Sequence, residues 1–144
     1  IKNIDASKIR MHICWGNYEG PHTHDIPLEK IMPIALKANV KYYLIEASNP
    51  RHSHEWKVFE KLKIQNDKMI VPGVIDSTTN FVEHPEVVKD RIIQFSKVID
   101  KENLMAGTDC GFSTFAGFGN VDEKIAYKKL ASLVEGAALA SKVL

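Results

Sequence analysis

Residues 68–99, KMIVPGVIDSTTNFVEHPEVVKDRIIQFSKVI, contain the pattern that decides the fold. The stretch opens with Lys68–Asp76, a nearly continuous apolar run of the kind found in strands buried on both faces of a parallel sheet. A helix is expected next, because Pro85 suits the first helical position and His84 can cap it. The apolar residues of this helix recur at the spacing of one helical face: Val88, Ile92, Phe95 and Ile99. The stretch therefore predicts one strand–helix unit.

Three further units of the same kind are expected on either side of this one. Their strands are predicted at Lys8–Trp15, Val40–Ala47 and Leu104–Cys110. Their helices are predicted at Thr23–Ala38 with Asp25 as the cap, in a short segment capped by Ser53, and at Asn120–Leu144, where Asn120 and Glu123 resemble a capping box. Strands and helices that alternate in this way predict a parallel α/β sheet covered by helices.

The number of units favours half of a (βα)8 barrel. A complete barrel needs about 250 residues, whereas this chain has 144 residues and four units. The glycine-rich motifs of nucleotide-binding folds, G-x-G-x-x-G and G-x-x-x-x-G-K, are absent from the sequence. We predict one partial domain over residues 1–144, with a small flavodoxin-like sheet as the alternative. The chain begins without methionine and enters a strand almost at once, so we expect it to be a piece of a larger domain.

The composition is that of an ordinary globular domain, with 44% hydrophobic residues, 26% charged residues and a formal net charge of +1. Basic residues are scattered among acidic ones, so no footprint for nucleic acid is expected. Uncharged apolar runs such as Met69–Ile75 are too short to cross a bilayer, so no membrane partner is expected. The chain has only two cysteines, which do not make a disulfide scaffold; we expect a cytoplasmic protein.

Candidate metal ligands stand at the ends of three expected strands. His12 and Cys14 are two residues apart, so their side chains lie on the same face of the first strand. Glu46 lies at the end of the second strand and Cys110 at the end of the fourth. Because function gathers at the carboxyl ends of barrel strands, these groups can meet, and together they suit zinc. Two alternatives are cysteines packed in the core and a disulfide between Cys14 and Cys110.

Other polar residues near these ends suggest supporting or competing roles. Asp76 and Asp109 are candidates to orient His12 or to hold polar groups of a substrate. His22 and His24 form an H-x-H pair that, with Asp76, could serve a mononuclear metallohydrolase of the barrel type. That enzyme class is the alternative function.

The remaining candidates are expected to be peripheral. His52 and His54 flank the start of a short helix and are interpreted as surface or substrate-loop residues. The segment FSTFAGFGN at 112–120, rich in glycine and phenylalanine, is interpreted as an apolar lid.

Four segments resemble the cobalamin-independent methionine synthase superfamily, most closely its shorter "methionine synthase II-like" members. They are HICWGN at 12–17, LIEASNPR at 44–51, VPGVIDSTTNFVEHPE at 71–86 and AGTDCGF at 106–112. The resemblance covers nearly the whole chain and implies a (βα)8 barrel, of which this chain is the last four units.

The resemblance also implies a site and a reaction. Carried over to this chain, the zinc ligands are His12, Cys14, Glu46 and Cys110. The reaction implied is methyl or alkyl transfer to a thiol, with homocysteine as the favoured acceptor, and Glu46, Asp76 and Asp109 in the catalytic site. The full-length synthases carry a histidine shortly after the aspartate of the third strand, where this chain has Ser77 and Thr78. That difference weighs against methylfolate as the donor, and related short proteins imply methylcobalamin or an epoxide; the choice among the three donors stays open.

The expected partners are a small-molecule thiol and a methyl or alkyl donor. A half-barrel has two open sheet edges and an uncovered inner face, so it is also expected to pair with the missing N-terminal half or with a second copy. A half-barrel subunit without catalytic activity is the third functional possibility.

Overall fold

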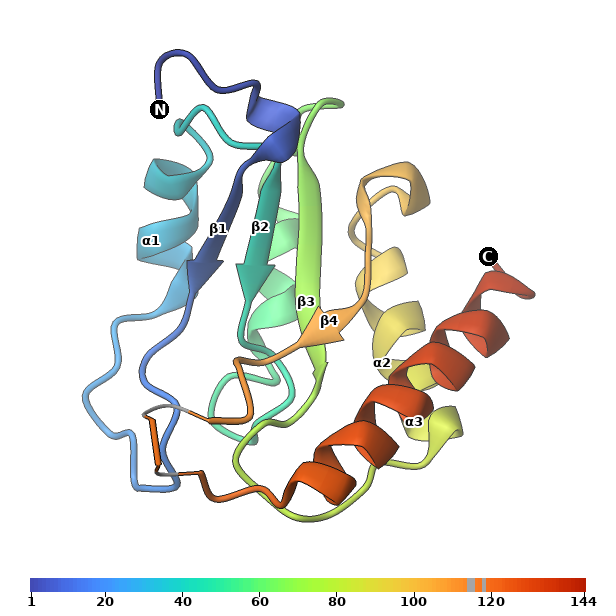
Figure 1. Ribbon diagram of the computed structural model, residues 1–144. Helices are drawn as coiled ribbons and strands as arrows, with labels where there is room; N and C mark the ends of the chain where they lie inside the picture. The colour runs from blue at the N-terminus through green and yellow to red at the C-terminus, as the bar shows by residue number, and fades with distance from the viewer. Residues whose placement is uncertain (114–115, 118) are drawn as a thin grey trace.

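The computed structural model describes residues 1–113, 116–117 and 119–144. Four parallel strands form one sheet in the order β1-β2-β3-β4, and Figure 1 shows them side by side. The strands are β1 (Arg10–Ile13), β2 (Tyr42–Ile45), β3 (Met69–Ile75) and β4 (Gly107–Thr108). All four predicted strands are therefore confirmed, each shorter than expected.

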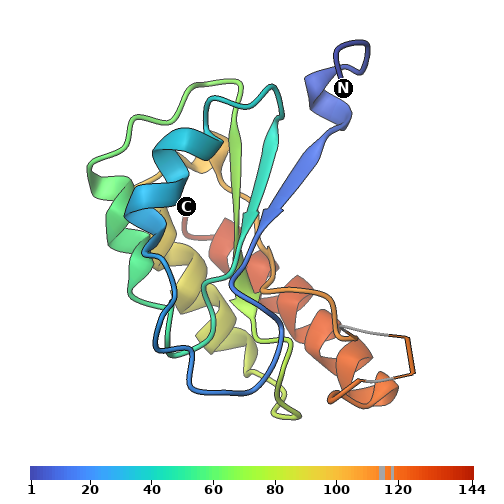
Figure 2. The ribbon, with the colours of Figure 1, turned by 90° about the vertical axis from the view of Figure 1, so that its left-hand side faces the viewer.

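Helices follow the strands along the chain. The α-helices are α1 (Leu28–Ala35), α2 (Pro85–Ser96) and α3 (Glu123–Ser141), and the short 3-10 helices are η1 (Ala6–Lys8), η2 (Glu55–Glu60) and η3 (Lys101–Asn103). Figure 2 shows α1, η2 and α2 on one side of the strands, while α3 packs along α2. The predicted alternation of strands and helices is confirmed.

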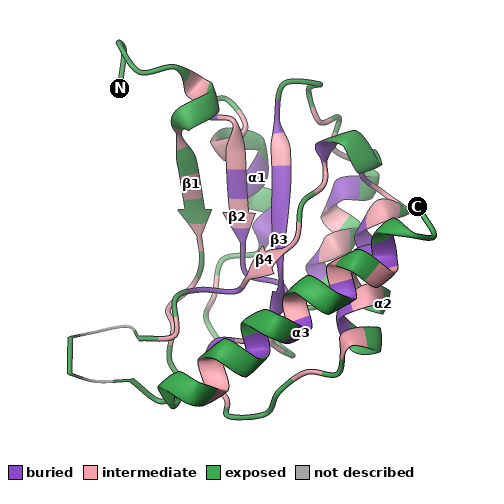
Figure 3. Ribbon diagram, turned by 45° about the vertical axis from the view of Figure 1, so that its right-hand side comes forward, coloured by how far each residue is buried: buried purple, intermediate pink, exposed green. Residues whose placement is uncertain are grey.

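The sheet has one face covered by helices and one face open. Tyr43 and Ile45 of β2 are buried in the core with Leu28 and Met32 of α1. Along β1 the residues alternate between exposed and half-buried (Figure 3). Met11 therefore packs against this core, while His12 is exposed. A second core joins β3, α2 and α3 through Val74, Ile75, Val88, Ile92 and Ala140. The open face is the one that a complete barrel encloses.

The order of the strands decides between the two predicted folds. A flavodoxin-like sheet reverses its strand order and carries helices on both faces, whereas this sheet runs in sequence order with α1, η2 and α2 on one face. The half-barrel prediction is confirmed. None of the helices that the structure describes combines the length and the apolar character needed to cross a membrane.

The first two helix starts after β1 and β2 differ from the sequence prediction. α1 begins at Leu28 rather than at residue 23. Pro27 is its N-cap residue, and a proline disfavours helical backbone in the residue before it, so Asp25 is not the cap. The second helix is a 3-10 helix that follows His54, so the expected cap at Ser53 was wrong.

The N-terminal caps of α2 and α3 test two of the capping residues predicted from the sequence. The His84 side chain accepts the N–H of Glu86, so the predicted cap of α2 is confirmed. For α3 the cap is Asp122, whose carboxylate accepts the N–H of Lys124, and the expected capping box of Asn120 and Glu123 is not formed. Asp122 lies directly before α3, and aspartate is a favoured capping residue, so it caps the helix in place of Asn120.

Candidate metal centre

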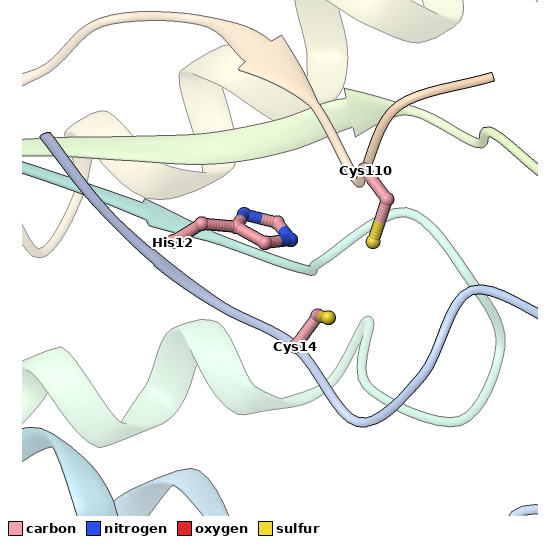
Figure 4. Close-up of side chains that lie close together, drawn as sticks. All are labelled: His12, Cys14 and Cys110. Atoms are coloured by element: carbon pink, nitrogen blue, oxygen red, sulfur yellow. The ribbon is translucent and has the colours of Figure 1, made fainter. Parts of the chain in front are cut away.

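The ends of β1 and β4 bring two sulfurs and one imidazole to the same place. His12 lies on β1, Cys14 follows it by two residues, and Cys110 lies two residues after β4. Ligand atoms of the three side chains all lie within 4.8 Å of one another. Figure 4 shows them pointing toward a common point. Both cysteines are free thiols, so the disulfide considered from the sequence is not formed.

The surroundings of Cys110 make it a poor thiolate by itself. Burial raises the pKa of the Cys110 thiol, and the nearby Cys14 and Glu46 raise it further. A divalent cation at this point would instead lower the pKa of the Cys110 thiol, because it stabilises the deprotonated sulfur. Two sulfurs and an imidazole nitrogen are also the donors that zinc prefers. The residues present therefore fit a zinc ion.

Glu46 stands beside this group and is held by its neighbours. It directly follows β2 and is buried. One carboxylate oxygen accepts the backbone N–H of Trp15 at 3.2 Å, and the other accepts the side-chain amide of Asn49. Among the described residues, the ligand atoms that lie within 4.8 Å of one another at this site belong to His12, Cys14 and Cys110. Those of Glu46 are not part of this group. The fourth ligand of the sequence analysis stays a prediction.

Asp109 supports the end of β2. Its Oδ1 accepts the N–H groups of Ala47 and Ser48, each at 2.8 Å, and its Oδ2 accepts that of Asn49 at 3.1 Å. Burial raises the pKa of Asp109 to about 7, against the backbone hydrogen bonds that lower it. The Asp109 carboxylate therefore accepts hydrogen bonds from the turn after Glu46. The sequence had predicted that it would orient the His12 imidazole.

Asp76 ends β3 and keeps a fixed, ionised carboxylate. Burial alone would raise its pKa, but hydrogen bonds from Thr79 and Thr78 outweigh it and hold the pKa below the ordinary value of 3.8. Asp76 lines a cleft of about 540 Å³ together with Glu46 and Tyr18. Its place beside this cleft agrees with contact to a substrate, which stays a prediction.

A polar chain that the sequence did not reveal holds the loop of Cys110. The Cys110 N–H donates to Ser77 Oγ at 3.2 Å, and this hydroxyl donates to Asn17 Oδ1 at 3.0 Å. The Asn17 amide in turn donates to the Gly111 carbonyl at 2.7 Å. The chain links the segments after β1, β3 and β4. The sequence marks Ser77 by its place after Asp76, and no sequence pattern pairs it with Asn17.

The histidine-rich loop forms a separate cluster with members different from those expected. His22 Nδ1 lies 3.1 Å from Asp25 Oδ2, and His52 Nε2 lies 2.9 Å from the same oxygen. His24 is exposed, and Asp76 makes its contacts elsewhere, so the constellation of His22, His24 and Asp76 is not formed. His52, interpreted from the sequence as a surface residue, is only 3% exposed. The metallohydrolase alternative loses the geometry on which it depended.

The predicted apolar lid at 112–120 includes residues 114, 115 and 118, which lie outside the described residues.

Comparison with known proteins places this chain in a family. Residues 3–138 match the family described as "Cobalamin-independent synthase, Catalytic domain". Methionine synthase of Saccharolobus solfataricus is 31% identical over 139 residues, which cover 94% of this chain and 35% of that protein. Methionine synthase of Thermococcus kodakarensis is 28% identical over 139 residues, with coverages of 95% and 35%.

A solved structure agrees with the fold. The B12-independent methionine synthase from Shewanella sp. W3-18-1, in complex with selenomethionine, superposes with a TM-score of 0.70 at 24% identity. The match covers 92% of this chain and 38% of that one. The chain spans about a third of the length of the curated relatives it matches, which each have 35% of their length covered. This chain belongs to the cobalamin-independent synthase family and corresponds to part of its catalytic domain.

Proposed function

We propose that this chain supplies the zinc-binding half of an enzyme that transfers a methyl or alkyl group to the sulfur of a thiol, with homocysteine as the acceptor. The observation that carries the proposal is the convergence of His12, Cys14 and Cys110 within 4.8 Å at the strand ends. Membership of the cobalamin-independent synthase family supports it, as do the matches to proteins named methionine synthase.

His12, Cys14 and Cys110 would hold the zinc ion, with Glu46 as the fourth ligand. A bound zinc ion lowers the pKa of a coordinated thiol and keeps it as the nucleophilic thiolate. In the transfer, the substrate thiol loses its proton, a bond forms from its sulfur to the donor carbon, and the bond from that carbon to its leaving group breaks. The carbon donor is methylcobalamin, an epoxide or methylfolate.

The protein residues around the ligands serve to place them. Glu46 has protein partners of its own in the Trp15 N–H and the Asn49 amide. These donors can stabilise its charge when the carboxylate is not a ligand, which suits a position that the substrate sulfur must enter. Asp109 fixes the turn after Glu46, and the Ser77 hydroxyl fixes the backbone of Cys110. Asp76 lies beside the cleft, where it can hold a polar group of the substrate.

The proposal also concerns the rest of the barrel. His12 is exposed on the open face of the sheet, where a second half-barrel would cover it. That half would come from the same polypeptide, a partner or a second copy. For residues 1–144 alone, light scattering should show association, and a stable monomer of this segment would contradict the pairing. The thiolate ligands require a reducing compartment, in agreement with the cytoplasm.

A thiol-alkylation assay tests the activity. Homocysteine is offered with methylcobalamin, methylfolate and an epoxide in parallel, to the protein with its barrel completed. We expect transfer from one donor, and loss of it in Cys110→Ser. His24→Ala is the matched control, because His24 is exposed and lies outside the group of His12, Cys14 and Cys110. Activity that survives Cys110→Ser but disappears in His24→Ala would overturn the proposal.

A further inference from the structure

The second cluster of histidines is built around one carboxylate oxygen. His22 Nδ1 and His52 Nε2 lie 3.1 Å and 2.9 Å from Asp25 Oδ2. Ligand atoms of the three residues all lie within 4.8 Å of one another. The cluster joins the loop between β1 and α1 to the segment before η2.

The other nitrogen of each imidazole already has an acceptor. His52 Nδ1 lies 2.9 Å from Glu55 Oε2, and Glu55 is itself fixed, because its Oε1 accepts the Leu28 N–H at 2.7 Å. His22 Nε2 lies 3.3 Å from the Tyr18 carbonyl oxygen. A neutral imidazole has one N–H. When that N–H lies on the outer nitrogen, toward Glu55 or Tyr18, the inner nitrogen directs its lone pair at Asp25 and is available to a metal ion.

Two arrangements satisfy these contacts. Without a metal ion, an imidazolium at His52 donates to both Asp25 and Glu55, and His22 donates its Nδ1–H to Asp25; burial lowers the pKa of His52, but these two carboxylates outweigh it and raise the pKa. With a divalent metal ion between the three side chains, both imidazoles are neutral and all three ligand atoms face the ion. A buried carboxylate or a carbonyl behind each metal-bound imidazole is also the usual arrangement at metal sites in proteins.

Aromatic residues hold both rings in place. Trp15 stacks on His52 with the ring centres 3.8 Å apart and an angle of 11° between the planes. The indole N–H of Trp15 donates to the Ile26 carbonyl at 2.7 Å, so its own position is fixed. Tyr18 stacks on His22 with the ring centres 4.3 Å apart. The donor atoms are therefore arranged before any ion binds.

We propose that His22, Asp25 and His52 bind a divalent transition-metal ion of the zinc type at a second site, separate from the site of His12, Cys14 and Cys110. Ligand atoms of a tetrahedral zinc ion lie about 3.3 Å apart, given bonds of about 2.0 Å. The distances of 3.1 Å and 2.9 Å need little change to meet this value. His22 also lines the cleft that contains Glu46 and Asp76.

Cobalt(II) distinguishes the two sites, because thiolate ligands give an intense charge-transfer band in the near ultraviolet and nitrogen and oxygen ligands do not. The Cys14→Ser/Cys110→Ser protein is titrated with Co²⁺ and its bound metal is counted after dialysis. We expect about one equivalent, with visible d–d bands and no charge-transfer band. Adding His22→Ala or Asp25→Asn should remove that equivalent, while adding His24→Ala, the matched control in the same loop, should not.

The outer carboxylate gives a second readout. Glu55→Gln keeps an oxygen for the Leu28 N–H and removes the charge behind His52, so the affinity for Co²⁺ should fall about 10- to 100-fold. Circular dichroism establishes that each variant is folded. The proposal is overturned if the cysteine-free protein binds no Co²⁺, or binds it equally well in folded His22→Ala and Asp25→Asn variants. It is also overturned if nitrogen NMR with Zn²⁺ present finds both imidazoles doubly protonated.

Discussion

Asp109 Oδ1 accepts the backbone N–H of Ala47 at 2.8 Å, so the residue before one proposed ligand, Cys110, holds the residue after another, Glu46. The same carboxylate accepts the N–H groups of Ser48 and Asn49. Buried Asp109 therefore joins the ends of β2 and β4 at the site.

Asp109→Ala should lower the free energy of unfolding by about 3 kcal/mol or more. The reason is that each buried N–H left without an acceptor costs about 1–3 kcal/mol, and three N–H groups depend on this carboxylate. Urea denaturation measures the loss. Asp109→Asn is the matched control, since it keeps one oxygen for Ala47 and Ser48, and it should lose less. Equal stability of Asp109→Ala and the wild type would refute the positioning role.

Gly136→Ala should destabilise the packing of α3 on α2. A Cβ at Gly136 would lie 2.5 Å from the Val88 Cβ and 2.8 Å from the Pro85 carbonyl oxygen. We expect a loss of about 1–3 kcal/mol from overpacking, although helix propensity alone would favour Ala by about 1 kcal/mol. Thermal unfolding is the measurement. Adding Val88→Ala removes the Cγ1 contact alone, so it should recover less than the full loss, because the contacts with the Cβ of residue 88 and with the Pro85 carbonyl remain. A stabilised single variant would show that the helices are further apart.

Lys129→Met should cost about 3–5 kcal/mol, because it leaves the partner charge of a buried ion pair without compensation. Lys129 is fully buried in α3, and its Nζ lies 2.9 Å from Glu83 Oε2. The double variant with Glu83→Gln should be more stable than Lys129→Met alone, which a double-mutant cycle in urea would show. Additive losses would mean that the two side chains do not interact.

Asp76 should titrate below 3.8 in the folded protein, because the hydrogen bonds from Thr79 and Thr78 hold its pKa down. The ionised carboxylate then stabilises the fold above pH 3.8, and this contribution is lost as the pH falls through the folded pKa. Carboxyl-carbon NMR follows the titration. Thr79→Val should raise the pKa of Asp76, and Thr23→Val, on an exposed residue of the loop before α1, should leave it unchanged. A wild-type value above 3.8 would contradict the assignment.

The sequence was sufficient for the parts of the fold that depend on local pattern. The apolar run at 68–76 and the Pro85 start of α2 predicted β3 and α2 because burial and helix capping leave direct marks on the sequence. The parity of His12 and Cys14 placed both on one face of the pleat. The half-barrel followed from the number of units.

What the sequence missed depends on contacts between distant residues. Asp25 looked like a helix cap, yet its carboxylate meets His52, which is 27 residues away. Asp109 looked like a partner for His12, but its carboxylate accepts three N–H groups of the turn after β2. The pairing of Ser77 with Asn17 spans 60 residues. Such pairs become visible only when the strands have been placed side by side.

The proposed zinc centre is tested most directly by X-ray absorption at the zinc edge. The measurement uses folded His22→Ala protein with one equivalent of zinc, so that the second proposed site does not contribute. We expect two sulfur neighbours at about 2.3 Å with nitrogen or oxygen at about 2.0–2.1 Å, the sulfurs being those of Cys14 and Cys110 and the nitrogen that of His12. A shell of nitrogen and oxygen alone would contradict it.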